Sequence, residues 1–322
     1  MIDKLELILA LARERHFGRA AESVGITQPT LSAGLRQLED QLGILIVERD
    51  SRFRGFTPEG ERVLGWARRI VGDTRAMRQE IDAHRRDVAG HLRLAVIPTA
   101  VPLVALLTAP MLRRHPALRF TVLSRASNQV LELMENLEVD AGVTYLDADT
   151  LRRVASVPLY REHFHLVTTA DGPFAGRDSV TWAEARVLPL CLLTPDMQNR
   201  RILDRLMGQS GMGQSGVNQA GGAPTARLES NSVLALLSHV RGGGWTSVLP
   251  GAVVRAMAGG SLAAGQDDGG ALRAAGLCSV PLTDPDTSFE VGLVVPRRAT
   301  LPLLTLALVA EARSLGKEPR AP

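Results

Sequence analysis

The sequence has few cysteines and no long apolar run. Only two of its 322 residues are cysteine, Cys191 and Cys278, too few for a disulfide framework or a four-cysteine zinc site. A membrane-spanning helix needs about 20 apolar residues, and the apolar stretches, such as residues 101–107, are much shorter. The N-terminus carries Asp3 and Glu6 inside an amphipathic pattern, unlike a signal peptide. We therefore expect a soluble, cytoplasmic protein that makes no contact with a membrane.

Aromatic residues and excess charge are also scarce. Aromatics make up 4% of the chain, which disfavours a single-strand nucleic-acid binder that stacks bases on rings. Lys and Arg number 37 against 34 Asp and Glu, so the formal net charge is only +3, and a basic surface over the whole molecule is excluded. Apolar residues at 45% and charged residues at 22% are typical of a globular protein, and the length predicts two or three domains.

Residues 1–43 have the periodicity of short helices separated by stops. Apolar residues recur at helical spacing from Leu5 to Ala12, and a second helical segment ends at Gly25. Thr27 is an N-cap candidate for a third helix, which ends at Gly43. The apolar stripe of this third helix is Leu31, Leu35, Leu38 and Leu42.

The second and third of these segments form a helix-turn-helix. Ala20 and Ala21 are small enough for two helices to approach closely, and Gly25 supplies the turn. Such a motif places the first residues of its second helix against base edges in the major groove of DNA. A short strand is expected at residues 44–47, followed by a hairpin or wing at residues 49–56 that carries Arg49, Arg52 and Arg54.

One long helix is predicted from Pro58 to about Val88. Thr57 is placed to cap it, and Glu59 and Glu61 complement the positive end of its dipole. An apolar seam with alternating spacings of four and three runs along it: Val63, Ala67, Ile70, Thr74, Met77, Ile81, His84 and Val88. Because polar residues fill the other faces, we expect this seam to pair with a second chain. The alternative is that the helix packs on its own domain.

From residue 90 the pattern changes to alternating strands and helices. Strands are expected at 91–97, 120–123 and 141–144, with helices at 101–114 and 128–137 between them, and the pattern repeats after Tyr160. This order is typical of parallel sheets with crossover helices. Late strands are expected within residues 282–295, and a closing helix at 301–315. Two similar α/β halves predict a cleft between them.

The N-terminal segment FGRAAESVGITQPTLSAGLRQLE, residues 17–39, resembles the helix-turn-helix of the LysR-type transcriptional regulators almost position by position. Leu42-Gly43, Glu48-Arg49 and FTPEG at residues 56–60 continue the resemblance. Beyond residue 90 the resemblance is one of layout. Two departures stand out: Ala33-Gly34 replace a basic or amide pair that is common in the family, and residues 208–222 exceed the usual loop.

The resemblance implies an α/β protein with an N-terminal all-α winged helix-turn-helix. Residues 1–58 would bind DNA, residues 59–89 would form the linker and dimerisation helix, and residues 90–322 would bind the effector. The last part would consist of two α/β subdomains resembling periplasmic binding proteins, subdomain I at about 90–161 and 271–322 and subdomain II at about 162–270. The family uses the linker helix to dimerise, so a homodimer or homotetramer is expected.

The expected contacts to double-stranded DNA lie on the third helix and the wing. They are Thr27, Gln28, Pro29, Thr30, Ser32, Arg36, Arg49, Arg52 and Arg54. Gln favours the N6 and N7 edge of adenine, and the planar fork of Arg suits phosphate. The alternative for Gln28 and Thr30 is plain helix capping, and for the wing arginines a solvated cluster of charge.

The expected effector site lies at the carboxyl ends of strands, where open α/β sheets bind ligands. Its residues are Thr99, Ala100, Ser127, Asn128, Thr144 and Thr194. Thr99 stands where a helix begins, so its hydroxyl and the free N–H groups there predict a site for an organic anion. The alternative is that Thr99 is a simple N-cap.

Other chemistry has weak support. His163 and His165 alternate on one strand without a partner at metal-ligand spacing, and Cys191 lies in an apolar run typical of a buried thiol. The glycines at 211, 213 and 216 match a nucleotide-binding pattern without its strand and helix. No catalytic residue, metal or cofactor is predicted.

We therefore expect a sequence-specific DNA-binding transcriptional regulator, not an enzyme, controlled by a small metabolite bound between the two subdomains. The alternative is a small-molecule-binding or enzymatic α/β protein whose N-terminal helices form only a dimerisation cap. Steeply salt-dependent binding of duplex DNA favours the first hypothesis. Turnover of a small substrate without DNA binding favours the second.

Overall fold

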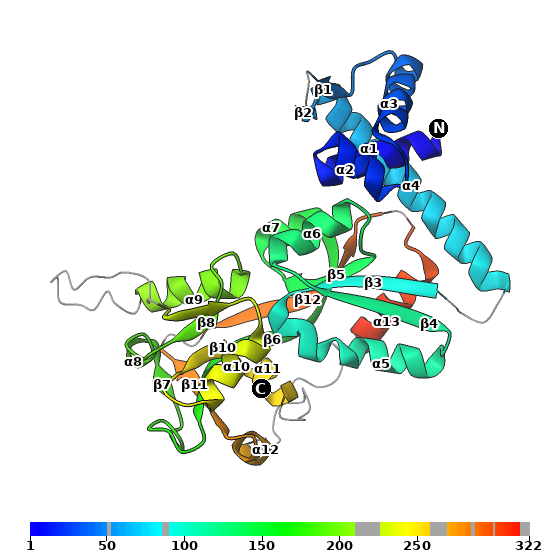
Figure 1. Ribbon diagram of the computed structural model, residues 1–322. Helices are drawn as coiled ribbons and strands as arrows, with labels where there is room; N and C mark the ends of the chain where they lie inside the picture. Colours follow the sequence, from blue (N-terminus) through cyan, green and yellow to red (C-terminus); the bar gives the residue numbers. More distant parts are fainter. Residues whose placement is uncertain are drawn as a thin grey trace.

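The protein consists of a small helical domain, a long helix and a larger α/β region, joined in that order (Figure 1). The computed structural model describes residues 1–49, 53–85, 90–209, 226–257, 269–284, 287–298 and 300–315. The long glycine-rich segment noted above falls mostly outside these residues. None of the helices in the described ranges is long and apolar enough to cross a membrane.

The N-terminal domain contains three helices and a two-stranded antiparallel hairpin. The helices are α1 (Ile2–Glu14), α2 (Phe17–Ser23) and α3 (Gln28–Leu42), and the strands are β1 (Val47–Arg49) and β2 (Phe53–Phe56). Three leucines of the predicted α3 stripe, Leu31, Leu35 and Leu38, are fully buried, but Leu42 is 41% exposed because α3 ends there.

The first strand begins later than the sequence pattern indicated. The expected strand at 44–47 overlaps β1 only at Val47. The N–H groups of Ile46 and Val47 donate hydrogen bonds to the Glu39 carboxylate instead of to a neighbouring strand at this point. This buried carboxylate therefore holds the connection between α3 and the wing.

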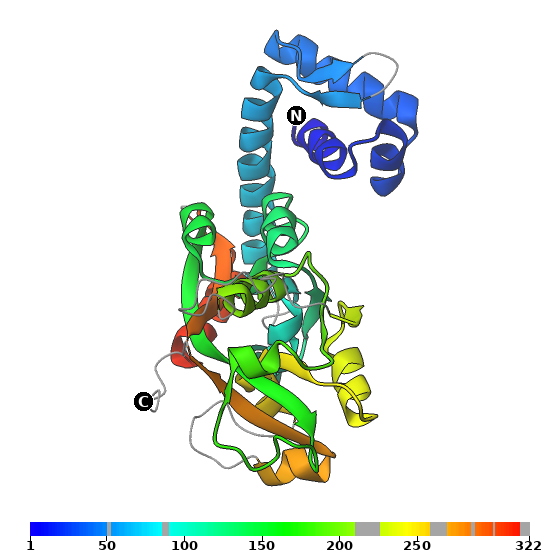
Figure 2. The ribbon, with the colours of Figure 1, turned by 90° about the vertical axis from the view of Figure 1, so that its left-hand side faces the viewer.

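Helix α4 (Pro58–Arg85) joins the two parts of the molecule and stands upright in Figure 2. The Thr57 hydroxyl accepts a hydrogen bond from the Gly60 N–H at 2.9 Å, which is the predicted cap. The buried face of α4 consists of Leu64, Ala67 and Val71, which belong to the core of the N-terminal domain.

The predicted seam of α4 divides between two environments. Ala67 is buried inside its own domain, whereas Ile70, Met77 and Ile81 are 38%, 54% and 47% exposed. Trp66, one turn before Ile70, is 59% exposed and extends the same apolar stripe. Val88 falls outside the described residues. The seam therefore serves partly as an intradomain contact and partly as an uncovered apolar surface.

The α/β region is built on one eight-stranded sheet, ordered β4-β3-β5-β12-β6-β11-β7 with β10 also paired to β6. Its strands are β3 (Gly90–Val96), β4 (Leu118–Ser124), β5 (Ala141–Tyr145), β6 (Val154–Thr169), β7 (Val180–Thr181), β10 (Ser247–Pro250), β11 (Leu277–Thr283) and β12 (Ser288–Pro296). A separate parallel pair is β8 (Cys191–Leu193) with β9 (Leu228–Ser230).

The long strand β6 passes through both subdomains. Residues 154–163 of β6 pair with β12, and residues 164–169 pair with β10 and β11. The expected subdomain boundary at 161/162 thus falls inside β6, which runs without a break from Val154 to Thr169. One strand therefore supplies part of the sheet on each side of the cleft.

Helices cover the sheet and fill the crossovers. They are α5 (Ala105–Arg114), α6 (Ser127–Glu135), α7 (Ala148–Arg153), α8 (Trp182–Ala185), α9 (Gln198–Gln209), α10 (Val233–Arg241), α11 (Gly251–Met257), α12 (Gly269–Ala274) and α13 (Leu303–Leu315). The helix expected at 101–114 is instead a 3-10 helix, η1 (Pro98–Leu103), followed by α5. Pro102 has no N–H to donate and breaks the regular α-helical pattern.

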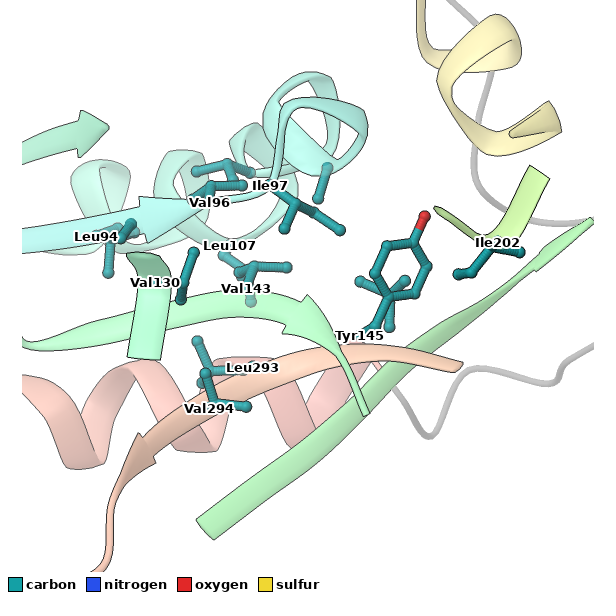
Figure 3. Close-up of a cluster of buried hydrophobic side chains, with 14 of the residues drawn as sticks. Leu94, Val96, Ile97, Leu107, Val130, Val143, Tyr145, Ile202, Leu293 and Val294 are labelled. Atoms are coloured by element: carbon teal, nitrogen blue, oxygen red, sulfur yellow. The ribbon is translucent and has the colours of Figure 1, made fainter. Parts of the chain in front are cut away.

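The main core lies between the sheet and these helices. Buried side chains from β3, β5 and β12, such as Leu94, Val143 and Leu293, pack together and continue to Tyr145 (Figure 3). Tyr145 lies between this cluster and Ile202 of α9 in the same view. The end of β5 is thus the place where the packing of the two subdomains meets.

Candidate functional site

The helix-turn-helix presents polar side chains at the start of α3. Thr27, Gln28, Pro29, Thr30 and Arg36 are exposed, and Ser32 is half-buried. The Thr27 hydroxyl caps the helix by accepting from the Thr30 N–H at 3.4 Å, and it lies 2.8 Å from the Thr30 hydroxyl. Capping therefore accounts for Thr27, whereas the Gln28 side chain is not the cap and stays on the surface.

The wing is only partly described. Arg54 is exposed on β2. Arg49 ends β1, but the surroundings of its side chain, like Arg52 as a whole, fall outside the described residues. Arg54 lies in the same small domain as α3, whose N-terminal residues face away from the buried leucines.

The second site is a small cleft between the two subdomains. It is lined by Ile97, Pro98, Thr99, Ala126, Ser127, Tyr145, Leu193, Met197, Gln198 and Asn199. The free space among these side chains is about 10 Å³, which is enough for one water at most. The two walls of the cleft therefore lie close together in this structure, and a larger molecule would enter only if they moved apart.

Three helices begin at the wall of this cleft. These are η1 at Pro98, α6 at Ser127 and α9 at Gln198. The N-cap residue of α6 is Ala126, which has no side-chain acceptor for the first N–H groups of the helix. The first N–H groups of a helix have no partner within the helix, and its dipole is positive at that end, so these helix starts favour negative charge at the cleft.

Several buried polar atoms at the cleft have unused hydrogen-bonding capacity. Within the described residues, no partner in hydrogen-bond geometry is found for the hydroxyl oxygens of Thr99 and Ser127 or for Asn199 Oδ1, although the Thr99 hydroxyl lies near Tyr145 and Glu162. All three side chains belong to the lining and are less than a tenth exposed. Since buried polar groups are ordinarily hydrogen-bonded, these atoms are available to a ligand.

The remaining predicted effector residues lie near the cleft but not in its lining. Thr144 and Thr194 have hydroxyls that are buried and lack a partner among the described residues. Ala100 is fully buried, and Asn128 is exposed on the outer side of α6. Thr99 and Ser127 are therefore the two predicted residues that the fold brings together at the cleft.

A buried carboxyl group lies behind the cleft wall. Glu162 of β6 has no exposed surface; its Oε2 accepts a hydrogen bond from the Tyr145 hydroxyl at 2.6 Å, and its Oε1 accepts from the Tyr160 hydroxyl at 3.2 Å. Asn199 Nδ2 donates to the Tyr145 hydroxyl oxygen at 3.3 Å. Tyr145 therefore connects the cleft lining to Glu162.

Burial is the largest influence on the ionisation of the Glu162 carboxyl group. It raises the pKa of Glu162 to about 7, although hydrogen bonds from Tyr145 and Tyr160 and the nearby Thr99 hydroxyl favour the ionised form. The pKa values of both tyrosines are also raised, first by burial and then by the adjacent carboxylate.

The buried Arg200 does not serve the cleft. Its guanidinium contacts Asp204 at 2.8 Å, Glu229 at 2.7 Å and the Leu193 carbonyl at 3.0 Å. These contacts fix α9 to β8 and β9. The cleft lining itself contains no cationic side chain among the residues that the structure describes.

Sequence reasoning missed Tyr145, Glu162 and Asn199. Glu162 stands between Arg161 and His163 in the chain, so its surroundings resemble an exposed strand. It is buried because Tyr145 and Thr99 lie against it, with Asn199 bonded to Tyr145. The one feature of the sequence that could have drawn attention to this network is that the chain has only two tyrosines, Tyr145 and Tyr160.

Helix α6 connects the cleft to the helix α4. It begins at Ser127 in the cleft wall, and the residues just after its end contact α4: Arg68 Nη2 donates to Asn136 Oδ1 at 3.3 Å, and Arg75 Nη1 donates to the Leu137 carbonyl at 2.8 Å. The Leu137 side chain is buried in the core of the N-terminal domain. One nine-residue helix thus reaches from the cleft to the DNA-binding domain.

Cys191, Cys278 and His165 lie in strands of the α/β region, away from the lining of the cleft. Cys191 and Cys278 are free thiols, 0% and 7% exposed, in different strands, and burial raises the pKa of Cys191. His165 Nδ1 lies 2.8 Å from the Ser279 hydroxyl, and burial lowers the pKa of His165 to about 4. No cluster of three metal-ligating side chains occurs in the described ranges.

Both the N-terminal domain and the α/β region are similar to parts of known regulators of one family. Residues 2–61 match the bacterial regulatory helix-turn-helix proteins of the lysR family, and residues 85–269 match the LysR substrate binding domain. OxyR of Escherichia coli K12, a DNA-binding transcriptional dual regulator, is 29% identical over 254 residues, 79% of this chain and 80% of its own length. A hydrogen peroxide-inducible genes activator of Dickeya chrysanthemi is 28% identical over 294 residues, 91% of this chain and 88% of its own.

Solved structures show the same architecture. A full-length OxyR from Pseudomonas aeruginosa with a cysteine-to-aspartate substitution has a TM-score of 0.66 and 25% identity, covering 97% of this chain and 94% of that one. The full-length regulator CbnR has a TM-score of 0.56 at 16% identity over 99% of this chain and 100% of its own, which shows the shared fold. The chain belongs to the LysR family of transcriptional regulators.

Proposed function

We propose that this chain is a sequence-specific DNA-binding regulator whose activity is controlled by a small organic anion bound between its two α/β subdomains. The observation that carries the proposal is the presence, in one chain, of an exposed helix-turn-helix surface and a separate cleft lined by unpartnered buried polar atoms. In this proposal residues 1–58 bind DNA, 59–89 link and dimerise, and 90–322 bind the effector.

The DNA-binding surface consists of the start of α3 and the wing. Gln28, Pro29 and Thr30 are the candidates for contact with base edges, and Ser32 and Arg36 lie farther along the same helix. Arg49, Arg52 and Arg54 of the wing bind phosphate or the minor groove. A regulator that binds chromosomal DNA acts in the cytoplasm.

The effector is bound by hydrogen bonds and helix N-termini rather than by a salt bridge. Thr99, Ser127 and Asn199 supply side-chain contacts, with Ala100, Asn128, Thr144 and Thr194 around them. The converging starts of η1, α6 and α9 supply N–H groups for a negative charge. The ligand is bound and released unchanged, since we assign no catalytic residue to the cleft.

Reversible ligand binding, rather than oxidation of a thiol, is the control that we propose here. Relatives of this chain carry the name hydrogen peroxide-inducible genes activator. A peroxide-reactive cysteine needs thiolate character and solvent access. Both cysteines of this chain are buried, and the surroundings of Cys191 favour the neutral thiol.

The active assembly is a homodimer or homotetramer that uses α4. Its exposed apolar stripe, formed by Trp66, Ile70, Met77 and Ile81, offers a partner chain a surface at helical spacing. Two helix-turn-helix domains brought together in this way would read two half-sites of a DNA operator.

The experiment that tests this function is footprinting of the purified full chain on its own upstream DNA, with and without a panel of small metabolites. We expect protection of a defined duplex segment that changes when an anionic metabolite is added. Affinity should fall steeply with salt, as expected when phosphates are neutralised. Turnover of a metabolite without protection of any duplex would overturn the proposal in favour of an α/β enzyme.

A further inference from the structure

Glu162 is a fully buried carboxyl group whose neighbours are hydroxyls and an amide. Tyr145 of β5 and Tyr160 of β6 donate to it, Thr99 of η1 faces it, and Asn199 of α9 contacts Tyr145. On β12 its strand neighbour is Phe289. Among the described residues, the two tyrosines are the titratable groups that face Glu162, and no cation contributes to its pKa.

The direction of these hydrogen bonds depends on the charge of Glu162. When Glu162 is ionised, it can only accept, so the hydrogen atoms of both tyrosine hydroxyls point to it. The Tyr145 oxygen then offers only an acceptor on its other side, where it takes the Asn199 amide hydrogen. In this state Tyr145 has no hydrogen to give to a ligand in the cleft.

A neutral Glu162 reverses this arrangement. Its own O–H can donate to one tyrosine oxygen, which frees the Tyr145 hydroxyl to turn its hydrogen toward the cleft. It also removes the negative charge behind the wall that would repel an anion at a short distance. The step moves one proton from solvent to a Glu162 oxygen and changes no other bond.

We propose that Glu162 is the specificity-determining residue of the cleft, acting through Tyr145: the cleft binds a small carboxylate together with one proton, which is held on Glu162. The inference rests on the proposed function, because it assumes that the cleft binds an anion. Neutral molecules of the same shape bind without this proton.

Burial supports the proton linkage independently of the ligand. It raises the pKa of Glu162 to about 7, so the cost of holding the proton is small near neutral pH. Below about pH 7 the affinity for a carboxylate should be nearly constant. Above it the affinity should fall, approaching tenfold for each pH unit, because each bound anion takes up one proton.

The test uses the full chain with two matched pairs of probes, acetate with acetamide and propionate with propionamide. Binding is followed by NMR titration between pH 5.5 and 8.5. For the wild type we expect carboxylate affinity to fall at least fivefold between pH 7 and 8.5, and amide affinity to stay constant. Glu162→Gln should remove the pH dependence, whereas Glu290→Gln, a partly buried glutamate on β12, should keep it.

The outcomes separate this inference from the proposed function. If the carboxylates bind, lose affinity in Thr99→Val and yet show no pH dependence, the cleft is an anion site and the role of Glu162 is wrong. If no carboxylate binds, or binding ignores Thr99→Val, the anion cleft and the inference both fail. If Glu162→Gln does not fold, the carbon-13 titration of Glu162 in the wild type decides: saturating acetate should raise the Glu162 pKa, and an unchanged pKa would overturn the inference.

Discussion

The Arg75 guanidinium of α4 donates a 2.8 Å hydrogen bond to the Leu137 carbonyl, two residues after the end of α6. Leu137 has a φ of 59°, in the left-handed region that a leucine rarely adopts. Its side chain is buried against the N-terminal domain. A shift of α6 at the cleft would therefore be transmitted to α4 at this contact, since the loop is fixed by both backbone and side chain.

Replacing Arg75 should weaken the coupling between effector and DNA. In Arg75→Met the contact to Leu137 is lost while the cleft and the helix-turn-helix remain. We expect effector affinity to stay within twofold of wild type and the effector-dependent change in DNA affinity to shrink several-fold, as measured by fluorescence anisotropy. Arg78→Met, on the exposed side of α4, is the control. If the effector changes DNA affinity equally in both variants, the contact between Arg75 and Leu137 does not couple the cleft to DNA binding.

Replacing Gln28 should relax base preference at one position. Because Gln28 is exposed at the start of α3 and is not the helix cap, Gln28→Ala should cost about 1–3 kcal/mol on the cognate duplex and much less on a mismatched one. Electrophoretic shifts with a set of single-base variants measure this. The same loss on every sequence would argue against a direct base contact.

A charge on the exposed stripe of α4 should split the assembly. Ile70 is 38% exposed in the single chain, and Ile70→Asp would place a charge in the proposed apolar interface, where burial is costly. Light scattering should show a smaller species. Val187→Asp is a matched control, because Val187 is 78% exposed far from α4 in the sequence. An unchanged mass for Ile70→Asp would exclude the stripe as the interface.

Glu162 should make stability depend on pH in a predictable direction. Its pKa is about 7 in the folded chain and about 4.3 when unfolded, so between these values the folded state holds a proton that the unfolded state releases. Glu162 therefore stabilises the folded chain fully below about pH 4.3. As the pH rises from there to 7, the free energy of unfolding falls by an amount on the order of 3 kcal/mol.

The comparison with Glu162→Gln separates the effect of Glu162 from that of other groups, such as the partly buried His165, whose lowered pKa changes stability with pH in the opposite direction. Urea unfolding at pH 5, 6 and 7.5 should show the wild type losing stability relative to the variant as the pH rises. A constant difference between the two proteins would mean that Glu162 does not titrate in this range.

Local patterns predicted the N-terminal domain well because its signals lie close together in the chain. The α3 cap at Thr27, its glycine stop at Gly43 and the Thr57 cap of α4 all depend on residues three or four positions apart. The positions of Thr99 and Ser127 in the cleft wall likewise follow from where strands end and helices begin, whereas their role in effector binding stays a prediction.

The buried network could not be predicted in this way. Tyr145 lies 17 residues from Glu162 and 54 from Asn199 in the sequence, and the three meet only when β5, β6 and α9 pack. The continuity of β6 likewise depends on pairing with β12 on one side and β10 and β11 on the other. Both features therefore depend on contacts between segments that are distant in the sequence, and the periodicity of a single segment does not reveal such contacts.

The most direct test of the account measures effector binding and DNA binding on Thr99→Val. Thr99 Oγ1 is fully buried at the cleft and, although it lies near Tyr145 and Glu162, has no partner in hydrogen-bond geometry among the described residues. A hydrogen bond to a charged group contributes about 1.5–3 kcal/mol. We expect the variant to bind its effector roughly tenfold or more weakly, while its effector-free DNA affinity stays at the wild-type level. Thr108→Val on α5, whose hydroxyl bonds its own helix, should change neither. Unchanged effector affinity in Thr99→Val, or a loss confined to DNA binding, would contradict the central claim that this cleft controls a separate DNA-binding surface.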